Sequence, residues 1–186
     1  FDQLANTHKL KRSQVKTAIY AFMYGAGTKR ILAETGLPLE GWKVLKERIA
    51  QEHVLIAFRQ RIKKEAEENE CSPPTPLGFQ TFLPKREAYK ALSYIVQATG
   101  AEIFRAWVLE LKKRGLGQFI VNMIHDEIIF ELPDHLNVYS VFSDVQECLN
   151  IGFNELLPDL RLTIKGSACR RWDEKAAIKI VPDTLS

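Results

Sequence analysis

The chain has 186 residues, of which 46% are hydrophobic and 26% charged, a balance that predicts a globular protein of one or two small domains. Its net charge is only +3, and no apolar run approaches the about 18 residues that a bilayer-spanning helix needs, so we expect no membrane partner. Three widely spaced cysteines without a metal-ligand pattern favour a reducing compartment.

The positive charge is concentrated near the start of the chain. Residues 1–64 carry 13 lysines and arginines against 5 acidic residues, whereas residues 65–186 carry 13 against 18. A basic first third suits a polyanionic partner, and counterion release would make such binding salt-dependent. An ordinary solvated basic face is the alternative. The first residue is Phe1 and no signal-like segment follows it, so we expect an intracellular piece of a longer protein.

The hydrophobic periodicity predicts an α+β fold. Apolar residues recur at helical spacing in five stretches, namely 12–27, 29–35, 41–69, 85–113 and 141–157. A proline-rich loop at 72–76 and a short extended piece at 78–83 interrupt the helices. Two runs rich in branched residues, 119–124 and 128–132, predict a tight antiparallel hairpin, and alternation over 160–165 predicts a half-exposed strand.

The first long helix combines two cations with two aromatic rings. Arg12, Lys16, Tyr20 and Tyr24 are four residues apart, so they share one broad face that is roughly 18 Å long. Cations suit phosphates, and rings suit bases or sugars. Gly25 and Gly27 are expected to end this helix. An ordinary amphipathic helix, with solvated lysines and packed tyrosines, is the alternative.

The tip of the predicted hairpin carries the triplet His125-Asp126-Glu127. The flanking strands are almost wholly apolar, so we expect the hairpin to be central and buried. A carboxylate in such a place is costly unless it is paired or binds a metal. Polar residues in an ordinary surface turn are the alternative.

These two motifs together resemble a known family. Arg-x3-Lys-x3-Tyr-x3-Tyr-Gly, from Arg12 to Gly25, resembles the nucleotide-binding fingers helix of family A DNA polymerases. His-Asp-Glu between apolar strands, about 100 residues later, resembles the palm motif that carries the family's second catalytic aspartate. Gln97, in VQATGAEIF, matches the helix that follows the primer–template minor groove. The closing GSACRRW resembles the family's last palm strand only loosely.

The resemblance implies a fold and a set of roles. A helical fingers subdomain over 1–84 would precede a palm portion over 85–186, whose antiparallel sheet carries the metal-binding hairpin. The implied nucleotide-binding residues are Arg12, Lys16 and Tyr20, and the implied primer–template contacts are Tyr24, Gly25, Ser93, Gln97 and His125. Asp126 and Glu127 would be the catalytic carboxylates, with Asp126 holding a divalent ion, expected to be Mg²⁺. Successive strand residues point to opposite faces, so Glu127 is the weaker ligand candidate. Primer–template DNA and deoxynucleoside triphosphates are the implied partners.

Three departures from the family pattern point to a divergent, phage-like member. Ser93 stands where relatives commonly have asparagine, and Tyr89 stands where polymerase I relatives have arginine. Phe79 and Gln80 follow Gly78 where bacterial relatives run through several arginines. The expected location is the cytoplasm of a bacterial or phage-infected cell, or an organelle.

The chain lacks an Asp-Tyr-Ser-type motif before its fingers helix, where the family has its other catalytic aspartate. Phosphoryl transfer on two metals needs carboxylates from at least two segments. We therefore expect a C-terminal part of a DNA polymerase that needs an upstream segment with that aspartate and a thumb, and that is inactive alone. A non-catalytic nucleic-acid-binding module of the same fold is the alternative. An HD-type phosphohydrolase would need more ligands than His8, His53 and His135 supply.

Overall fold

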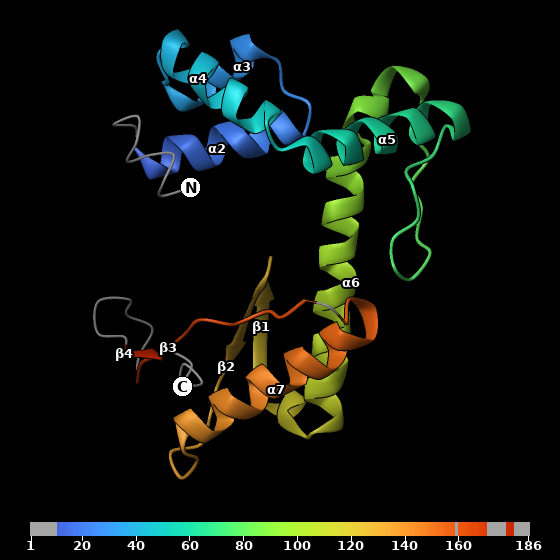
Figure 1. The fold of residues 1–186 in the computed structure, drawn as a ribbon. Helices are drawn as coiled ribbons and strands as arrows, with labels where there is room; N and C mark the ends of the chain where they lie inside the picture. Colours follow the sequence, from blue (N-terminus) through green and yellow to red (C-terminus); the bar gives the residue numbers. More distant parts are fainter. Residues whose placement is uncertain (1–10, 159, 171–177, 181–186) are drawn as a thin grey trace. The chain divides into compact units, whose positions relative to one another are not determined.

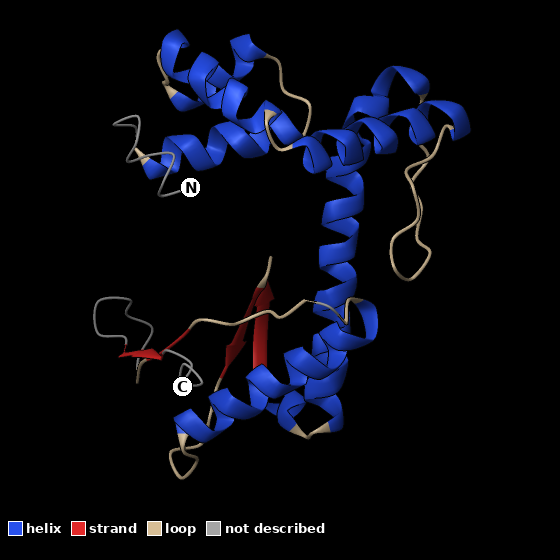
Figure 2. Ribbon diagram, in the orientation of Figure 1, coloured by secondary structure: helices blue, strands red, loops and turns tan. Residues whose placement is uncertain are grey.

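The computed structural model describes residues 11–158, 160–170 and 178–180 (Figure 1). The chain divides into two compact units, residues 1–98 and 99–186, which are described separately below. Figure 2 shows helices together with two small antiparallel sheets, so the predicted α+β class is confirmed. The predicted border between fingers and palm at residues 84/85 stays a prediction. No described helix combines the length and the apolar character that crossing a bilayer requires.

The first unit is helical throughout its described part. Its elements are α2 (Arg12–Met23), α3 (Thr28–Thr35), α4 (Leu39–Ala50), α5 (His53–Asn69), the 3-10 helix η1 (Lys85–Lys90) and the start of α6 (Ala91–Lys113). Helix α2 lies against α3 and α4, and α5 lies against η1. Two buried clusters hold these helices together, and α2 contributes Val15 and Ala18 to the first and Met23 to the second.

An aromatic group joins α2, α4 and α5 within the first unit. The Phe22 ring of α2 lies 5.7 Å from the Trp42 ring of α4, and the Arg59 guanidinium of α5 lies 4.8 Å from the Phe22 ring centroid. Burial in this apolar setting lowers the pKa of Arg59. The indole nitrogen of Trp42 donates a hydrogen bond to the Thr28 hydroxyl at 3.1 Å. The apolar side of α2 is therefore fixed by specific contacts as well as by burial.

The expected single helix over 41–69 is two helices, with a break at Gln51 and Glu52. Trp42 and Ile49 before the break pack in the first cluster, whereas Ile62 and Ala66 after it pack in the second. Both α4 and α5 bury apolar residues at helical spacing, so the periodic pattern runs on through the break. The two helices bury these residues in different clusters, which is why the chain bends between them.

The loop between α5 and η1 is held by its own hydrogen bonds. Ser72 accepts a bond from the Thr81 backbone through its hydroxyl and donates one from its own backbone to the Thr81 carbonyl. Cys71 and Phe82 form an isolated antiparallel bridge. The predicted extended piece at 78–83 is confirmed only at this bridge.

The second unit packs two helices beside a hairpin. Its elements are the rest of α6, η2 (Leu116–Phe119), β1 (Ile120–Ile124), β2 (Glu127–Phe130), α7 (Val138–Leu156), β3 (Gly166–Ala168) and β4 (Ile178–Ile180). A Cβ on Gly152 of α7 would lie 2.9 Å from the Ala106 carbonyl carbon of α6, so only glycine permits this close approach. Trp107 donates a hydrogen bond to the Val145 carbonyl at 2.9 Å across the same helix pair.

The strand predicted over 160–165 is absent, because that segment bonds to a side chain of α7 and has no strand partner in the described structure. The Gln146 amide donates to the Leu162 carbonyl at 3.0 Å and accepts from the Ile164 backbone at 2.8 Å. The strand that does form, β3, covers the first residues of GSACRRW and pairs with β4. Trp172 of that motif lies outside the described residues.

Candidate functional site

The predicted cation-and-tyrosine face exists on α2. Arg12, Lys16 and Tyr20 are exposed, whereas Val15 and Ala18 on the opposite side are 0% exposed. The Lys16 ammonium lies 5.9 Å from the Tyr20 ring centroid. The face therefore has the charge and the π-surfaces that a nucleotide would contact.

The two tyrosines of this face form one stacked pair. The rings of Tyr20 and Tyr24 are 6.2 Å apart between centroids, and their planes differ by 22°. Tyr24 caps the helix, and Gly25 then takes a φ of +92°, as predicted for a glycine that ends a helix. Gly27 does not end this helix; its extended backbone, with φ −76°, caps the start of α3 instead.

Gly25 also meets a residue that is distant in the sequence. A Cβ at Gly25 would lie 2.7 Å from Cδ2 of Tyr89 and 3.0 Å from its carbonyl oxygen, so the η1 backbone and ring pack directly on this glycine. Helical spacing predicts the Tyr20–Tyr24 pair but carries no signal for this contact, because Tyr89 lies on another element.

The two predicted primer–template residues of α6 interact with each other. The Gln97 amide donates a hydrogen bond to the Ser93 hydroxyl at 2.9 Å, one helical turn away. Gln97 is exposed and Ser93 is half-buried. Both residues belong to the first unit.

The predicted hairpin is present in the second unit, with a shorter turn than expected. Strands β1 and β2 are antiparallel, Ile124 pairs with Glu127, and the turn consists of His125 and Asp126 alone. Glu127 is therefore the first residue of β2. His125 has a φ of +54°, a region that residues with a Cβ rarely adopt. The strained backbone of His125 is thus part of the turn that places the Asp126 carboxylate at the tip.

The expectation that the hairpin is central and buried is wrong for the chain as described. Val121, Met123 and Ile124 are 56%, 52% and 41% exposed, and the turn is exposed too. One side of the hairpin, including Ile128 and Phe130, packs against the buried cluster of α6 and α7. The side chains of Met123 and Ile124 point to opposite faces of β1, so the exposed apolar surface of the hairpin is not confined to one face.

The carboxylates of the hairpin can supply only part of a metal site. Carboxylate oxygens suit Mg²⁺, and Asp126 presents them at an exposed turn. Among the described residues no group of three or more His, Cys, Asp or Glu could hold a metal ion. Cys148 is no candidate, because it is buried and burial raises the pKa of its thiol.

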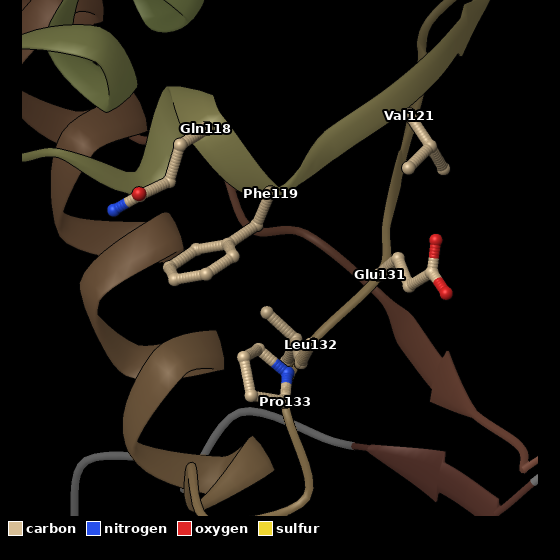
Figure 3. Close-up of a pocket in the computed structure, with 6 residues that line it drawn as sticks. All are labelled: Gln118, Phe119, Val121, Glu131, Leu132 and Pro133. Atoms are coloured by element: carbon tan, nitrogen blue, oxygen red, sulfur yellow. The ribbon is translucent and has the colours of Figure 1, made fainter.

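A surface cavity of about 330 Å³ lies at the other end of the hairpin. It is lined by Gln118, Phe119, Val121, Glu131, Leu132 and Pro133 (Figure 3). These residues flank the open ends of β1 and β2, away from the turn. None of the residues with a predicted role lines this cavity.

Comparison with known proteins decides the family. Residues 2–174 match the family model described as DNA polymerase family A. The chain belongs to DNA polymerase family A. Three polymerases are similar in sequence: DNA polymerase I of Aquifex aeolicus (31% identical, 88% of this chain and 30% of the relative), DNA polymerase theta of Caenorhabditis elegans (25%, 92% and 11%) and the DNA polymerase of Mycobacterium phage D29 (24%, 66% and 20%).

The fold of this family A chain also matches a solved polymerase domain. The structure is the polymerase domain of Pol1 from M. smegmatis, solved with DNA primer-template and dNTP. The TM-score is 0.67 at 17% identity, over 80% of this chain and 30% of that one, so the likeness concerns the fold. The chain spans 30% or less of the length of each of these proteins. Polymerases of family A use divalent metal ions.

Proposed function

We propose that this chain supplies the fingers and part of the palm of a DNA-directed DNA polymerase, which adds nucleotides to a primer 3′ end under the direction of a template. The observation that carries the proposal is the hairpin that sets Asp126 at its turn, downstream of a helix with a cation-and-tyrosine face. Because the chain belongs to DNA polymerase family A, we assign nucleotide binding to this helix and metal binding to this hairpin.

Helix α2 is proposed to bind the incoming deoxynucleoside triphosphate. Arg12 suits bidentate contact with phosphate oxygens, and Lys16 suits a point contact. Tyr20 would lie against the sugar and base, while Tyr24 and Gly25 would border the template base. Because the buried side of α2 is fixed by its packing, the binding face is held in place before a nucleotide arrives.

Asp126 is proposed to contribute one ligand to a two-metal site for Mg²⁺, with Glu127 beside it. Bound metal ions would neutralise the charge that develops on the transferred phosphoryl group. The chain's own contribution is to hold the Asp126 carboxylate at an exposed tip, because the two-residue turn projects it beyond both strands. His125 would lie close to the primer end.

The remaining ligands are proposed to come from an upstream segment that carries the family's other aspartate, within the same polypeptide or a separate one. Two-stranded sheets are marginal unless further strands or a covering layer complete them. Such a segment is proposed to cover exposed apolar side chains of β1, among which are Val121, Met123 and Ile124. The proposed location is the cytoplasm of a bacterial or phage-infected cell.

Complementation tests this proposal. The chain alone, an upstream segment with an Asp-Tyr-Ser-type motif alone, and the two together are assayed for extension of a primer on a template. We expect extension only from the pair, and equal inactivity of the two separate parts. Extension that the upstream segment performs equally well without this chain would contradict the proposal.

A second candidate function rests on the charge distribution. The excess of cations in residues 1–64 fits a non-catalytic module that binds nucleic acid through its backbone. Such a module would bind DNA in a salt-sensitive way with no preference for a deoxynucleoside triphosphate. Measuring nucleotide and DNA binding side by side separates the two functions.

A further inference from the structure

A third tyrosine, Tyr89 of η1, lies at the C-terminal end of α2. Tyr20 and Tyr24 form a stacked pair, and Gly25 follows directly. The Tyr89 ring of η1 packs on the Gly25 backbone, 2.7 Å from where a Cβ would stand. All these residues belong to the first unit, and Tyr89 contacts the glycine that directly follows Tyr24.

A lysine accompanies each end of this series. Lys16 lies 5.9 Å from the Tyr20 ring centroid, and Lys90 lies 5.7 Å from the Tyr89 ring centroid. Glu87 accepts a bond from Lys90 at 2.8 Å, which holds the ammonium in place and raises the pKa of Lys90. The arrangement combines planar rings with flanking cations, as surfaces that bind single-stranded nucleic acid do.

Packing alone does not account for Tyr89. Its neighbours in η1 and α6, Ala88 and Ala91, are fully buried, whereas Tyr89 is 44% exposed, like Tyr20. The ring therefore uses only part of its surface to contact Gly25. The remaining surface of the Tyr89 ring is exposed at the end of α2. Because the ring is already held by Gly25, it loses little conformational entropy when a base stacks on it.

We propose that Tyr89 stacks on an unpaired base of single-stranded DNA and so extends the α2 face beyond Tyr24. The inference rests on the proposed function of α2 and adds to it a contact from a different element. The proposed occupant is a nucleobase, because a planar ring suits a base and the lysines at both ends of the series suit the phosphates that accompany it.

Fluorescence of the full chain with a single-stranded oligodeoxynucleotide that carries one 2-aminopurine tests the proposal. Stacking on a tyrosine ring quenches this base. Tyr89→Ala is expected to weaken binding roughly 5- to 30-fold and to abolish the Tyr89-dependent quenching. Tyr89→Trp keeps a planar ring and is expected to retain both. Tyr139→Ala, which removes an exposed tyrosine from α7, is the matched control and should change neither.

Tyr89→Leu protects the test against misfolding, because leucine can still fill the contact with Gly25 but cannot stack as a ring does. It should lose quenching while its thermal midpoint stays close to that of the unchanged chain. Equal quenching by Tyr89→Leu and the unchanged chain, or no quenching by the unchanged chain, would overturn the inference. Neither result changes the complementation outcome, so the inference and the proposed function can fail separately.

Discussion

The α2 face and the β1–β2 hairpin differ in how much of their support lies within this chain. Helix α2 buries Val15 and Ala18 completely, whereas Val121 and Met123 of the hairpin are more than half exposed. A helix satisfies most of its backbone hydrogen bonds internally, whereas the outer edges of a two-stranded sheet leave backbone groups unpaired. The binding face on α2 is therefore supported within one unit, whereas we propose that further strands support the hairpin.

The largest expected effect on stability comes from removing Trp42, which packs against α2 in the first buried cluster. Trp42→Ala should lower the free energy of unfolding of the first unit by about 3–5 kcal/mol, since it removes a buried ring and opens a cavity. Hydrogen exchange is the measurement: amides of α2 and α4 should lose protection. Trp107→Ala in the second unit is the matched control and should act on α6 and α7. Equal loss of protection in β1 and β2 after Trp42→Ala would show that the α2 face and the hairpin do not depend on separate support.

Nucleotide binding to the α2 face should depend on Lys16. Lys16→Ala should weaken binding of a deoxynucleoside triphosphate roughly 10- to 100-fold, because it removes a charge-assisted phosphate contact. Titration of the chain with a fluorescent nucleotide measures this. Lys46→Ala, at an exposed lysine of α4, changes the net charge equally and should have little effect. Similar losses in both variants would mean that the face has no specific role.

The hydroxyl of Tyr20 should affect sugar selection in the assembled polymerase. By its resemblance to the fingers helix of family A polymerases, Tyr20 is proposed to stand at the position where a tyrosine goes with tolerance of sugars that lack the 3′-hydroxyl. Tyr20→Phe should therefore raise discrimination against dideoxynucleotides at least several-fold, since one polar contact is worth about 1 kcal/mol. Competition between the two nucleotide types during primer extension gives the ratio. Equal ratios for both enzymes would show that the Arg12–Tyr24 register is misassigned.

The smallest expected effect concerns the strained turn of the hairpin. With φ at +54°, His125→Gly should be more stable than His125→Ala by about 1 kcal/mol, because glycine has no Cβ penalty there. Lys46 in α4 is the control, where glycine should be the less stable of the two by a similar amount. Denaturant unfolding measures both pairs. The same order at both positions would mean that the turn is not strained.

Sequence patterns predicted local features well. The spacing of Arg12, Lys16, Tyr20 and Tyr24 predicted a helix on which these residues share one face, and α2 has that face, because helical periodicity depends on neighbours a turn away. The hairpin was also found, because branched residues and a short polar turn are local signals.

Features that depend on distant residues were missed. The break between α4 and α5 follows from two separate clusters, and Gln146 replaces a strand partner for residues 162 and 164. Apolar strands predicted a buried hairpin, yet burial depends on a covering layer that no local pattern reveals. The contact between Gly25 and Tyr89 joins two elements and has no periodic signature.

Asp126 is proposed to contribute one ligand to a metal site whose other ligands come from an upstream segment. Single-turnover primer extension by the complemented polymerase, with Asp126→Asn and Glu127→Gln compared, tests this role of Asp126 most directly. We expect Asp126→Asn to slow extension by about three orders of magnitude or more, because the proposed metal site would lose a charged ligand. Glu127→Gln should slow extension much less. Unchanged extension by Asp126→Asn would show that Asp126 is not a metal ligand.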